Sequence, residues 1–456
     1  MRQSSFMRFA KARACGLFLA AILAAGCSRP PRIERVVLLG FDGVGPNLVE
    51  PLVAQGHLPA LRRIMTDGAY GPLRSFAPTK SNILWTSVAT GKTMLKHGIV
   101  DWTFVNQQGL TVPYEDRGRR VKTYWEILDE RGISTATINW WITHPPSPLR
   151  RGIVVSSAFK RLPEPDTVHP GGLFAPLNAL RVPFPDGVED VRRREGIPVW
   201  SEEEATSAMG ATRQILRSYP EYLAQDATVD RVSDWIHSNR SVQAFSTYFR
   251  LPDVTSHFAT HFLDKALHQA ATEKEAAGRL GPEDIARLDA DFARVVLPAY
   301  AFMDRIVAKY LDRLDQRTLL LVCSDHGFRY QGGRYSHAMP GLEPPDGVVF
   351  VLGPGVRAGA RILGSSLFDV APTILWALGQ PVAEDMDGAP LSVFEAAFSD
   401  GHPMKRIASY EHGARPQGEA TGDRRLDEQV LQDLRTLGYI GGGEEEPREG
   451  GATPRP

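Results

Sequence analysis

The sequence predicts an α/β fold in which helices flank a doubly wound, mostly parallel sheet. Short apolar runs rich in β-branched residues, as in 36–41, 317–323 and 348–353, alternate with segments whose apolar spacing suits helices. The chain has 456 residues and a net charge of −1, enough for one large domain with insertions or for two domains. Because no sustained basic run lies outside the extreme N-terminus, a nucleic-acid partner is not expected.

The expected elements follow one another as strand, helix, strand along most of the chain. Strands are expected at 35–41, 134–141, 241–250, 317–323 and 348–353. Helices are expected at 59–65, 83–91, 121–131, over most of 263–314 and at 369–378. From residue 159 the regular pattern breaks into proline, glycine and scattered charge, which predicts an inserted cap over about 159–240.

The N-terminal residues 1–27 have the pattern of a secretory signal: basic residues, a short apolar stretch at 16–25, then small residues. The apolar stretch is short for a membrane span. Its ending, Ala24-Ala25-Gly26-Cys27, resembles a bacterial lipobox, although the large aliphatic residue Leu23 falls one place early. We therefore expect an exported, lipid-anchored cell-envelope protein modified at Cys27, with plain cleavage or an uncleaved anchor as the alternatives.

The rest of the chain divides into a main domain at 33–395 and a C-terminal extension at 396–456. Glycine, glutamate and proline dominate the sequence beyond about 441, which predicts disorder there. After the signal is removed, Cys323 is the cysteine that remains inside the domain, in an apolar strand. It is expected to be a buried, free thiol.

An acid and a hydroxyl group are expected to share one site. Asp42 stands between two glycines, Gly40-Phe41-Asp42-Gly43, at the end of the first strand. The carboxyl ends of parallel strands are where open α/β proteins bind ligands. Thr79 and Ser81 lie just before the segment expected to be a helix, so one of them is expected at the helix N-terminus, which favours anions.

Three further polar clusters follow the predicted strands. Carboxylate and imidazole side chains suit zinc, and also manganese or iron, better than calcium. With Asp42 and one hydroxyl the clusters supply seven donors, which is too many for one tetrahedral ion and suits two ions that share a substrate oxygen. The clusters consist of Asp253 with His257, Asp325 with His326, and His337.

Alternatives remain open for some of these residues. Asp253 and His257 are four apart, so they would also suit a local ion pair on one helical turn, and His261 is four residues further on. Thr79 would also serve as a helix cap.

The order and wording of these motifs resemble the alkaline phosphatase superfamily, and within it the type I phosphodiesterases and nucleotide pyrophosphatases. The similarity spans roughly residues 35–391. It rests on Gly40-Phe41-Asp42-Gly43, Pro78-Thr79-Lys80-Ser81, Thr90-Gly91, His97-Gly98-Ile99, Pro252-Asp253 to His257, Ser324-Asp325-His326-Gly327 and His337.

The resemblance implies a role for each residue. Asp42, Asp325 and His326 would bind one zinc ion beside the nucleophile oxygen, and Asp253, His257 and His337 would bind the other. Counting back from Thr90-Gly91 places Ser81 at the nucleophile position, with Thr79 as its competitor. A phosphorylated Ser81 would form, and water would then hydrolyse it.

Two departures from the family pattern limit what can be carried over. Many nucleotide pyrophosphatases have an asparagine after the His-Gly-Ile segment, where this chain reads Val100-Asp101-Trp102. We expect Asn82 or a backbone N–H to bind the phosphoryl oxygen instead. Sulfatases need a Cys or Ser followed by Pro and Arg, which the sequence after Ser81 lacks, so sulfate esters are disfavoured.

The sequence therefore predicts a metal-dependent hydrolase of phosphate esters, monoester or diester, with two divalent ions that are zinc or manganese. Its substrate would be a small-molecule, lipid or glycan phosphate ester. One alternative is a transferase that passes the phospho-group to an alcohol. The other is a cell-envelope binding protein that keeps the fold without turnover.

Overall fold

The computed structural model describes residues 32–162, 164–198, 200–208, 210–338, 341–412, 424–436 and 440. The predicted signal, the lipidation of Cys27 and the predicted disorder beyond residue 441 lie outside these ranges and stay predictions. None of the helices in the described ranges combines the length and the apolar composition of a membrane span.

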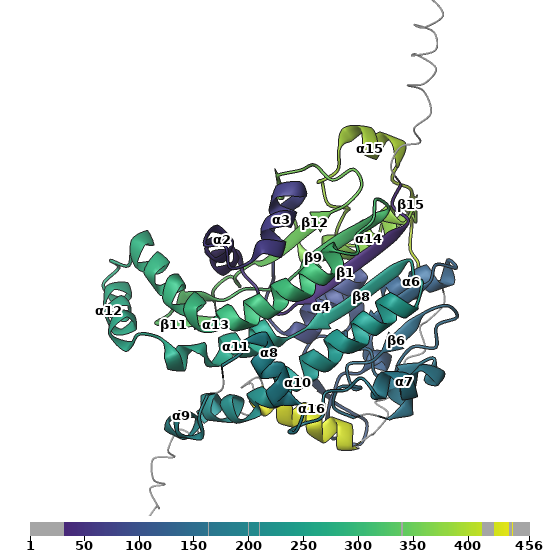
Figure 1. Cartoon of the computed structure of the whole chain (residues 1–456). Helices are drawn as coiled ribbons and strands as arrows, with labels where there is room; N and C mark the ends of the chain where they lie inside the picture. The colour runs from purple at the N-terminus through teal and green to yellow at the C-terminus, as the bar shows by residue number, and fades with distance from the viewer. Residues whose placement is uncertain are drawn as a thin grey trace, which may run out of the picture.

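A nine-stranded sheet forms the centre of the molecule, in the order β13-β2-β12-β9-β1-β8-β5-β6-β7 (Figure 1). Parallel pairs join β9 to β1, β1 to β8, β8 to β5, β5 to β6 and β13 to β2, whereas β12 and β7 run antiparallel to their neighbours. This mostly parallel sheet between helices confirms the predicted fold class. Its strands are β1 Arg35–Phe41, β2 Ala69–Leu73, β5 Thr135–Ile138, β6 Ile153–Val155, β7 Val168–His169, β8 Ala244–Phe249, β9 Thr318–Cys323, β12 Gly347–Leu352 and β13 Ala360–Arg361.

Helices cover both faces of the sheet because the central strands are apolar on both sides. In β1, Val37 and Leu39 belong to one buried cluster, and Val36 and Leu38 to the other. The first cluster contains side chains of α2 Pro46–Ala54, α3 Pro59–Asp67, α10 Gly210–Asn239, α11 Leu251–Ala259 and α13 Pro282–Leu311. The second contains side chains of α4 Ser81–Thr90, α6 Tyr124–Glu130 and α14 Val370–Ala377.

The remaining elements are short or peripheral. Three two-stranded sheets are made by β3 Thr103–Val105 with β4 Thr111–Pro113, β10 Arg329–Gln331 with β11 Arg334–Ser336, and β14 Val382–Ala383 with β15 Arg406–Ile407. The other helices are α5 Met94–His97, α7 Phe174–Asn178, α8 Val188–Glu195, α9 Glu202–Ser207, α12 Lys265–Ala276, α15 Ala396–Gly401 and α16 Arg424–Thr436.

The segment predicted as a cap contains β7 and the helices α7 to α10. Within it, β7 extends the central sheet, and α10 packs against β8 and β5. The segment therefore contributes directly to one layer of the fold. The division of the chain into domains stays a prediction.

Candidate active site

The topology gathers the predicted metal ligands at the carboxyl ends of three adjacent strands. Asp42 follows β1, Asp325 and His326 follow β9, and α11, which carries Asp253 and His257, follows β8. Because β1 lies between β9 and β8, these side chains meet at one edge of the sheet. The hairpin of β10 and β11 then returns the chain so that His337 joins them.

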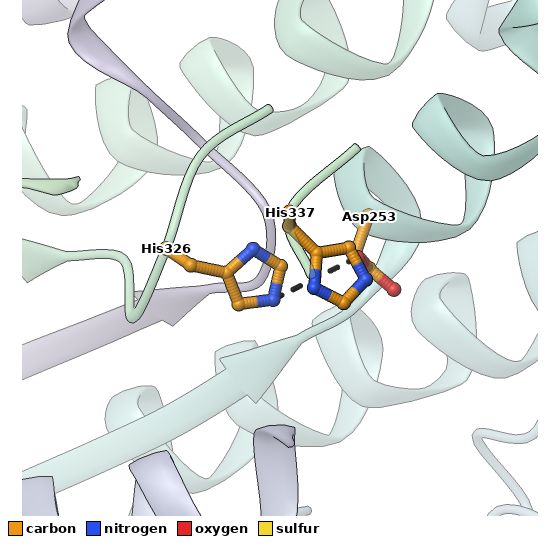
Figure 2. A group of neighbouring side chains, drawn as sticks. All are labelled: Asp253, His326 and His337. Atoms are coloured by element: carbon orange, nitrogen blue, oxygen red, sulfur yellow. Dashed lines mark ion pairs between the residues drawn. The ribbon is translucent and has the colours of Figure 1, made fainter. Parts of the chain in front are cut away.

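The distances between the ligand atoms are short. Nε2 of His326 lies 3.2 Å from Oδ1 of Asp42, 3.8 Å from Oδ2 of Asp325 and 3.9 Å from Oδ1 of Asp253. Oδ1 of Asp253 lies 3.4 Å from Nε2 of His257, which is 3.2 Å from Nε2 of His337. Figure 2 shows the imidazoles of His326 and His337 beside the carboxylate of Asp253.

These distances fit a metal centre. Four ligands at the usual zinc bond lengths of about 2.0–2.2 Å lie about 3.4 Å from one another in a tetrahedron. Two groups have ligand atoms that all lie within 4.8 Å of one another: Asp42 with Asp325 and His326, and Asp253 with His326 and His337. Both carboxylate oxygens of Asp325 are buried, and neither has a hydrogen-bond partner within the described ranges.

The pKa shifts of these residues are also consistent with a metal centre. Burial raises the pKa of Asp325 well above its ordinary value, and the negative charge of Asp42 raises it further. Burial would lower the pKa of His326, but Asp325 and Asp42 raise it overall to about 10. The pKa of His337 falls well below its ordinary value because it is buried and lies beside His326 and His257. A bound cation would compensate the charge of these buried carboxylates.

Ser81 is the first residue of α4 and is buried. Trp85 follows one turn later, so the two side chains share a face of the helix. The indole Nε1 of Trp85 donates to Oδ2 of Asp42 at 3.3 Å. This contact turns the face of α4 that carries Ser81 toward Asp42.

The other predicted residues around the nucleophile are placed as follows. Thr79 is buried two residues before α4, but the N-cap position belongs to Lys80, whose side chain makes no capping hydrogen bond. Nδ2 of Asn82 donates to the carbonyl of Asp101 at 2.6 Å. His261 lies in a short 3-10 turn against the ring of Phe262. Neither His261 nor the predicted ligand His257 belongs to the two candidate metal groups, and His257 instead lies beside Asp253 and His337.

Two residues that support the site were not found from the sequence. Trp85 and Tyr248 both donate to Oδ2 of Asp42, Tyr248 at 2.5 Å through its hydroxyl. The spacing of four between Ser81 and Trp85 was visible in the sequence. Nothing in the sequence marked Tyr248, which belongs to a strand that is buried throughout.

The glycines around Asp42 are required by close approaches. A Cβ at Gly40 would lie 2.6 Å from the ring of Trp85. Gly43 has a φ of +75°, and a Cβ there would lie 2.7 Å from Cα of Asp253. The motif Gly-Phe-Asp-Gly thus allows α4 and α11 to approach the end of β1.

A mostly parallel sheet with a buried group of aspartates and histidines at its carboxyl edge, beside a serine at a helix N-terminus, defines an α/β protein with a candidate metal-dependent active site. The sequence model of the type I phosphodiesterase / nucleotide pyrophosphatase family matches residues 36–331, and the chain belongs to this family. It is therefore a phosphoester hydrolase, which confirms the resemblance seen in the sequence. No curated protein matches the chain.

Solved structures with a similar arrangement include two hydrolases. Human ectonucleotide pyrophosphatase / phosphodiesterase 5 is 13% identical, with a TM-score of 0.44, covering 78% of this chain and 97% of its own. The phosphonate monoester hydrolase of Agrobacterium radiobacter is 14% identical, with a TM-score of 0.46, covering 79% of this chain and 76% of its own. Similarities this low do not transfer the substrate of either protein to this chain.

Proposed function

We propose that the protein hydrolyses phosphate esters through a covalent phosphoserine at Ser81, at a site with two divalent ions, most simply zinc. The observation that carries this proposal is the position of Ser81. It begins α4, and the indole one turn later is hydrogen-bonded to Asp42. A residue on the same face of the helix as Ser81 therefore contacts a candidate metal ligand, which supports Ser81 as the nucleophile.

The chain's own residues suit this chemistry. Two ions bound by Asp42, Asp325 and His326 and by Asp253, His257 and His337 would lower the pKa of the attacking hydroxyl and stabilise charge on the phosphoryl oxygens. Carboxylates and imidazoles suit zinc or manganese. Without cations, three buried aspartates would repel a phosphate group from this edge of the sheet.

The proposed reaction has two displacements at phosphorus. Oγ of Ser81 forms a bond to phosphorus while the bond from phosphorus to the ester oxygen breaks, and the alcohol leaves. The oxygen of a water molecule then bonds to phosphorus while the bond from phosphorus to Oγ of Ser81 breaks. This step releases phosphate, or a phosphate monoester when the substrate is a diester, and a proton from the water regenerates the serine hydroxyl. Ser81 is the first residue of α4, and a helix N-terminus favours the phosphoryl oxygens.

The substrate class and the location of the protein belong to this proposal. We propose a small-molecule, lipid or glycan phosphate ester as the substrate, and export to the cell envelope with a lipid on Cys27. The sequence of residues 1–27 supports the location. Mass spectrometry of the mature N-terminus would test it, because plain signal cleavage would leave the terminal residue without fatty acids.

The function is tested by the turnover of p-nitrophenyl phosphate and bis-p-nitrophenyl phosphate with zinc-loaded protein. We expect Ser81→Ala to lower kcat by at least about a thousandfold on the preferred ester, as the loss of a nucleophile does in other hydrolases. Ser87→Ala is the matched control, because Ser87 is a buried serine of the same helix that contacts His97 instead. It should retain activity within a few fold.

Several outcomes would contradict this proposal. Loss of activity in Thr79→Ala but not in Ser81→Ala would move the nucleophile to Thr79. Full activity in both variants would exclude a covalent serine or threonine intermediate. If glycerol added to the assay receives the phospho-group, the protein is a transferase, and if the zinc-loaded protein turns over neither ester, the non-catalytic binding role is favoured.

A further inference from the structure

A second polar cleft lies apart from the candidate metal ligands, between α10, the segments around Lys160 and Arg181, and α16. Its volume is about 1090 Å³. Figure 1 shows α16, in yellow, beside α10, and the two helices are in contact. None of the residues assigned above to metal binding or nucleophilic attack lines this cleft.

Lys160 lines the cleft and is more than nine-tenths buried. Its Nζ lies 6.0 Å from the ring centroid of Tyr248 and makes no hydrogen bond or ion pair with the part of the chain that the structure describes. A buried ammonium without such a partner is costly. Burial lowers its pKa well below the ordinary value, and the positive charges of Arg250 and Arg161 lower it further.

Arg181 is a second cation in this cleft without a carboxylate partner. Nη2 donates to the carbonyl of Lys160 at 3.0 Å, so the two residues are neighbours. Nη1 is buried and has no hydrogen-bond acceptor among the described residues. Burial lowers the pKa of the Arg181 guanidinium, and no acidic neighbour contributes to this change.

The surrounding charges leave a positive excess. Asp433 of α16 contacts Arg161 and lies 3.4 Å from the guanidinium of Arg250. Asp226 accepts hydrogen bonds from the backbone of Arg250 and Leu251, and its charge, like that of Asp433, acts to raise the pKa of Lys160. Asp226 and Asp433 thus lie among four basic side chains, which are Lys160, Arg161, Arg181 and Arg250. Glu221, Glu428 and Arg435 also line the cleft, so the described side chains leave an excess of one positive charge.

We propose that this cleft binds the phosphate group of a small ligand between Lys160 and Arg181. A phosphate carries a charge of about −1.5 to −2 at neutral pH, opposite in sign to this excess, and it offers the acceptors that Nζ and Nη1 lack. The cleft is coupled to the catalytic edge through Tyr248. The ring of Tyr248 faces Lys160, and its hydroxyl donates to Asp42.

The inference is tested by calorimetric titration of the zinc-loaded full chain with inorganic phosphate. We expect two binding events, one at the metal centre and one in the cleft. Asp325→Asn should remove the first and keep the second. Lys160→Met and Arg181→Met should each weaken the second by at least about tenfold, since a charge-assisted hydrogen bond contributes that much.

Arg435→Met is the matched control, because Arg435 is an exposed basic residue at the rim of the same cleft. It should leave the second event unchanged within about threefold. Thermal unfolding of each variant shows whether it has folded. If Lys160→Met does not fold, the phosphate affinity of Arg181→Met tests the proposal.

The phosphate group could belong to free inorganic phosphate or to a phosphate ester. Titration of Asp325→Asn with glycerol phosphate distinguishes them, because tighter binding of glycerol phosphate than of inorganic phosphate assigns the cleft to a phosphate ester.

The inference is overturned if Asp325→Asn binds no phosphate, or if its binding is the same when Lys160 or Arg181 is also replaced. It stands independently of the proposed catalytic function. The unmodified protein could bind phosphate in the cleft and not at the site that contains Asp325. That result would count against the metal centre and not against the cleft.

Discussion

Tyr248 shows how a single residue outside the predicted ligand set can support it. Its hydroxyl donates to Oδ2 of Asp42, which leaves Oδ1 facing His326. Burial raises the pKa of this hydroxyl well above its ordinary value, and the charge of Asp42 raises it further, so the group remains a proton donor. Hydrogen bonds of this kind orient a carboxylate toward a metal ion.

We expect Tyr248→Phe to lower zinc affinity by about 10–100-fold, the usual effect of removing a hydrogen bond behind a metal ligand. Competition with a chelator measures the affinity, and kcat/KM with p-nitrophenyl esters should fall in parallel at limiting zinc. The control is Tyr222→Phe, because Tyr222 is a buried tyrosine whose hydroxyl has no hydrogen bond to the described residues. Equal zinc affinity in both variants would show that the hydroxyl does not support the site.

At the scale of elements, the position of α11 decides whether Asp253 and His257 reach the other ligands. Asp226, on α10, accepts hydrogen bonds from the backbone N–H groups of Arg250 and Leu251, at 2.9 and 2.8 Å. It thereby satisfies the N-terminus of α11 from a neighbouring helix. Its pKa is raised, chiefly because it is buried.

Asp304 provides a matched comparison. It accepts from the N–H groups of Ala60 and Leu61 at the start of α3, which carries none of the candidate site residues. We expect Asp226→Asn and Asp304→Asn each to lower the free energy of unfolding by about 1–3 kcal/mol. Only Asp226→Asn should also lower kcat/KM of the zinc-loaded enzyme, by at least about tenfold.

Denaturant titration and steady-state kinetics on both variants measure these effects. A similar loss of activity in Asp304→Asn would mean that general destabilisation, and not the position of α11, causes the effect.

At the scale of the whole molecule, His97 makes stability depend on pH. It is buried, its Nε2 lies 3.0 Å from Oγ of Ser87, and its Nδ1 accepts from the N–H of Ile99. Burial, assisted by the charge of Arg119, lowers its pKa from 6.5 to about 3. Between these two values the unfolded chain binds a proton that the folded protein does not.

Its contribution to stability is therefore complete above pH 6.5 and is lost as the pH falls toward about 3. We expect the free energy of unfolding to fall with a slope of up to about 1.4 kcal/mol per pH unit from this group. In His97→Asn, whose amide can still donate and accept, this part of the slope should vanish.

Urea denaturation at pH 7.5, 6 and 5 measures the slope. The control is His57→Asn, at an exposed position, which should keep the slope of the unmodified protein. An unchanged slope in His97→Asn would refute the assignment.

Much of this architecture was predictable from the chain alone. The strands at 35–41 and 317–323 were recognised because they are continuously apolar, and Asp42, Asp325 and His326 because they follow such strands directly. The spacing of four between Asp253 and His257 left open that they share one helical turn, and α11 carries both. These patterns involve residues close together in the chain, so they can be recognised without knowledge of the fold.

Only the tertiary structure decided which distant groups meet. The sequence does not state that β1 lies between β8 and β9, that the hydroxyl of Tyr248 reaches Asp42, or that Asp226 caps α11. The sequence also does not show that Lys160 and Arg181 are neighbours, or that neither has a carboxylate partner among the described residues. The sequence by itself determined the central strands at 35–41, 317–323 and 348–353, the family and the chemical types of the candidate ligands, because periodicity and motif spacing encode them. The pairing of strands and the burial of charge decided the rest, because they depend on contacts between residues far apart in the chain.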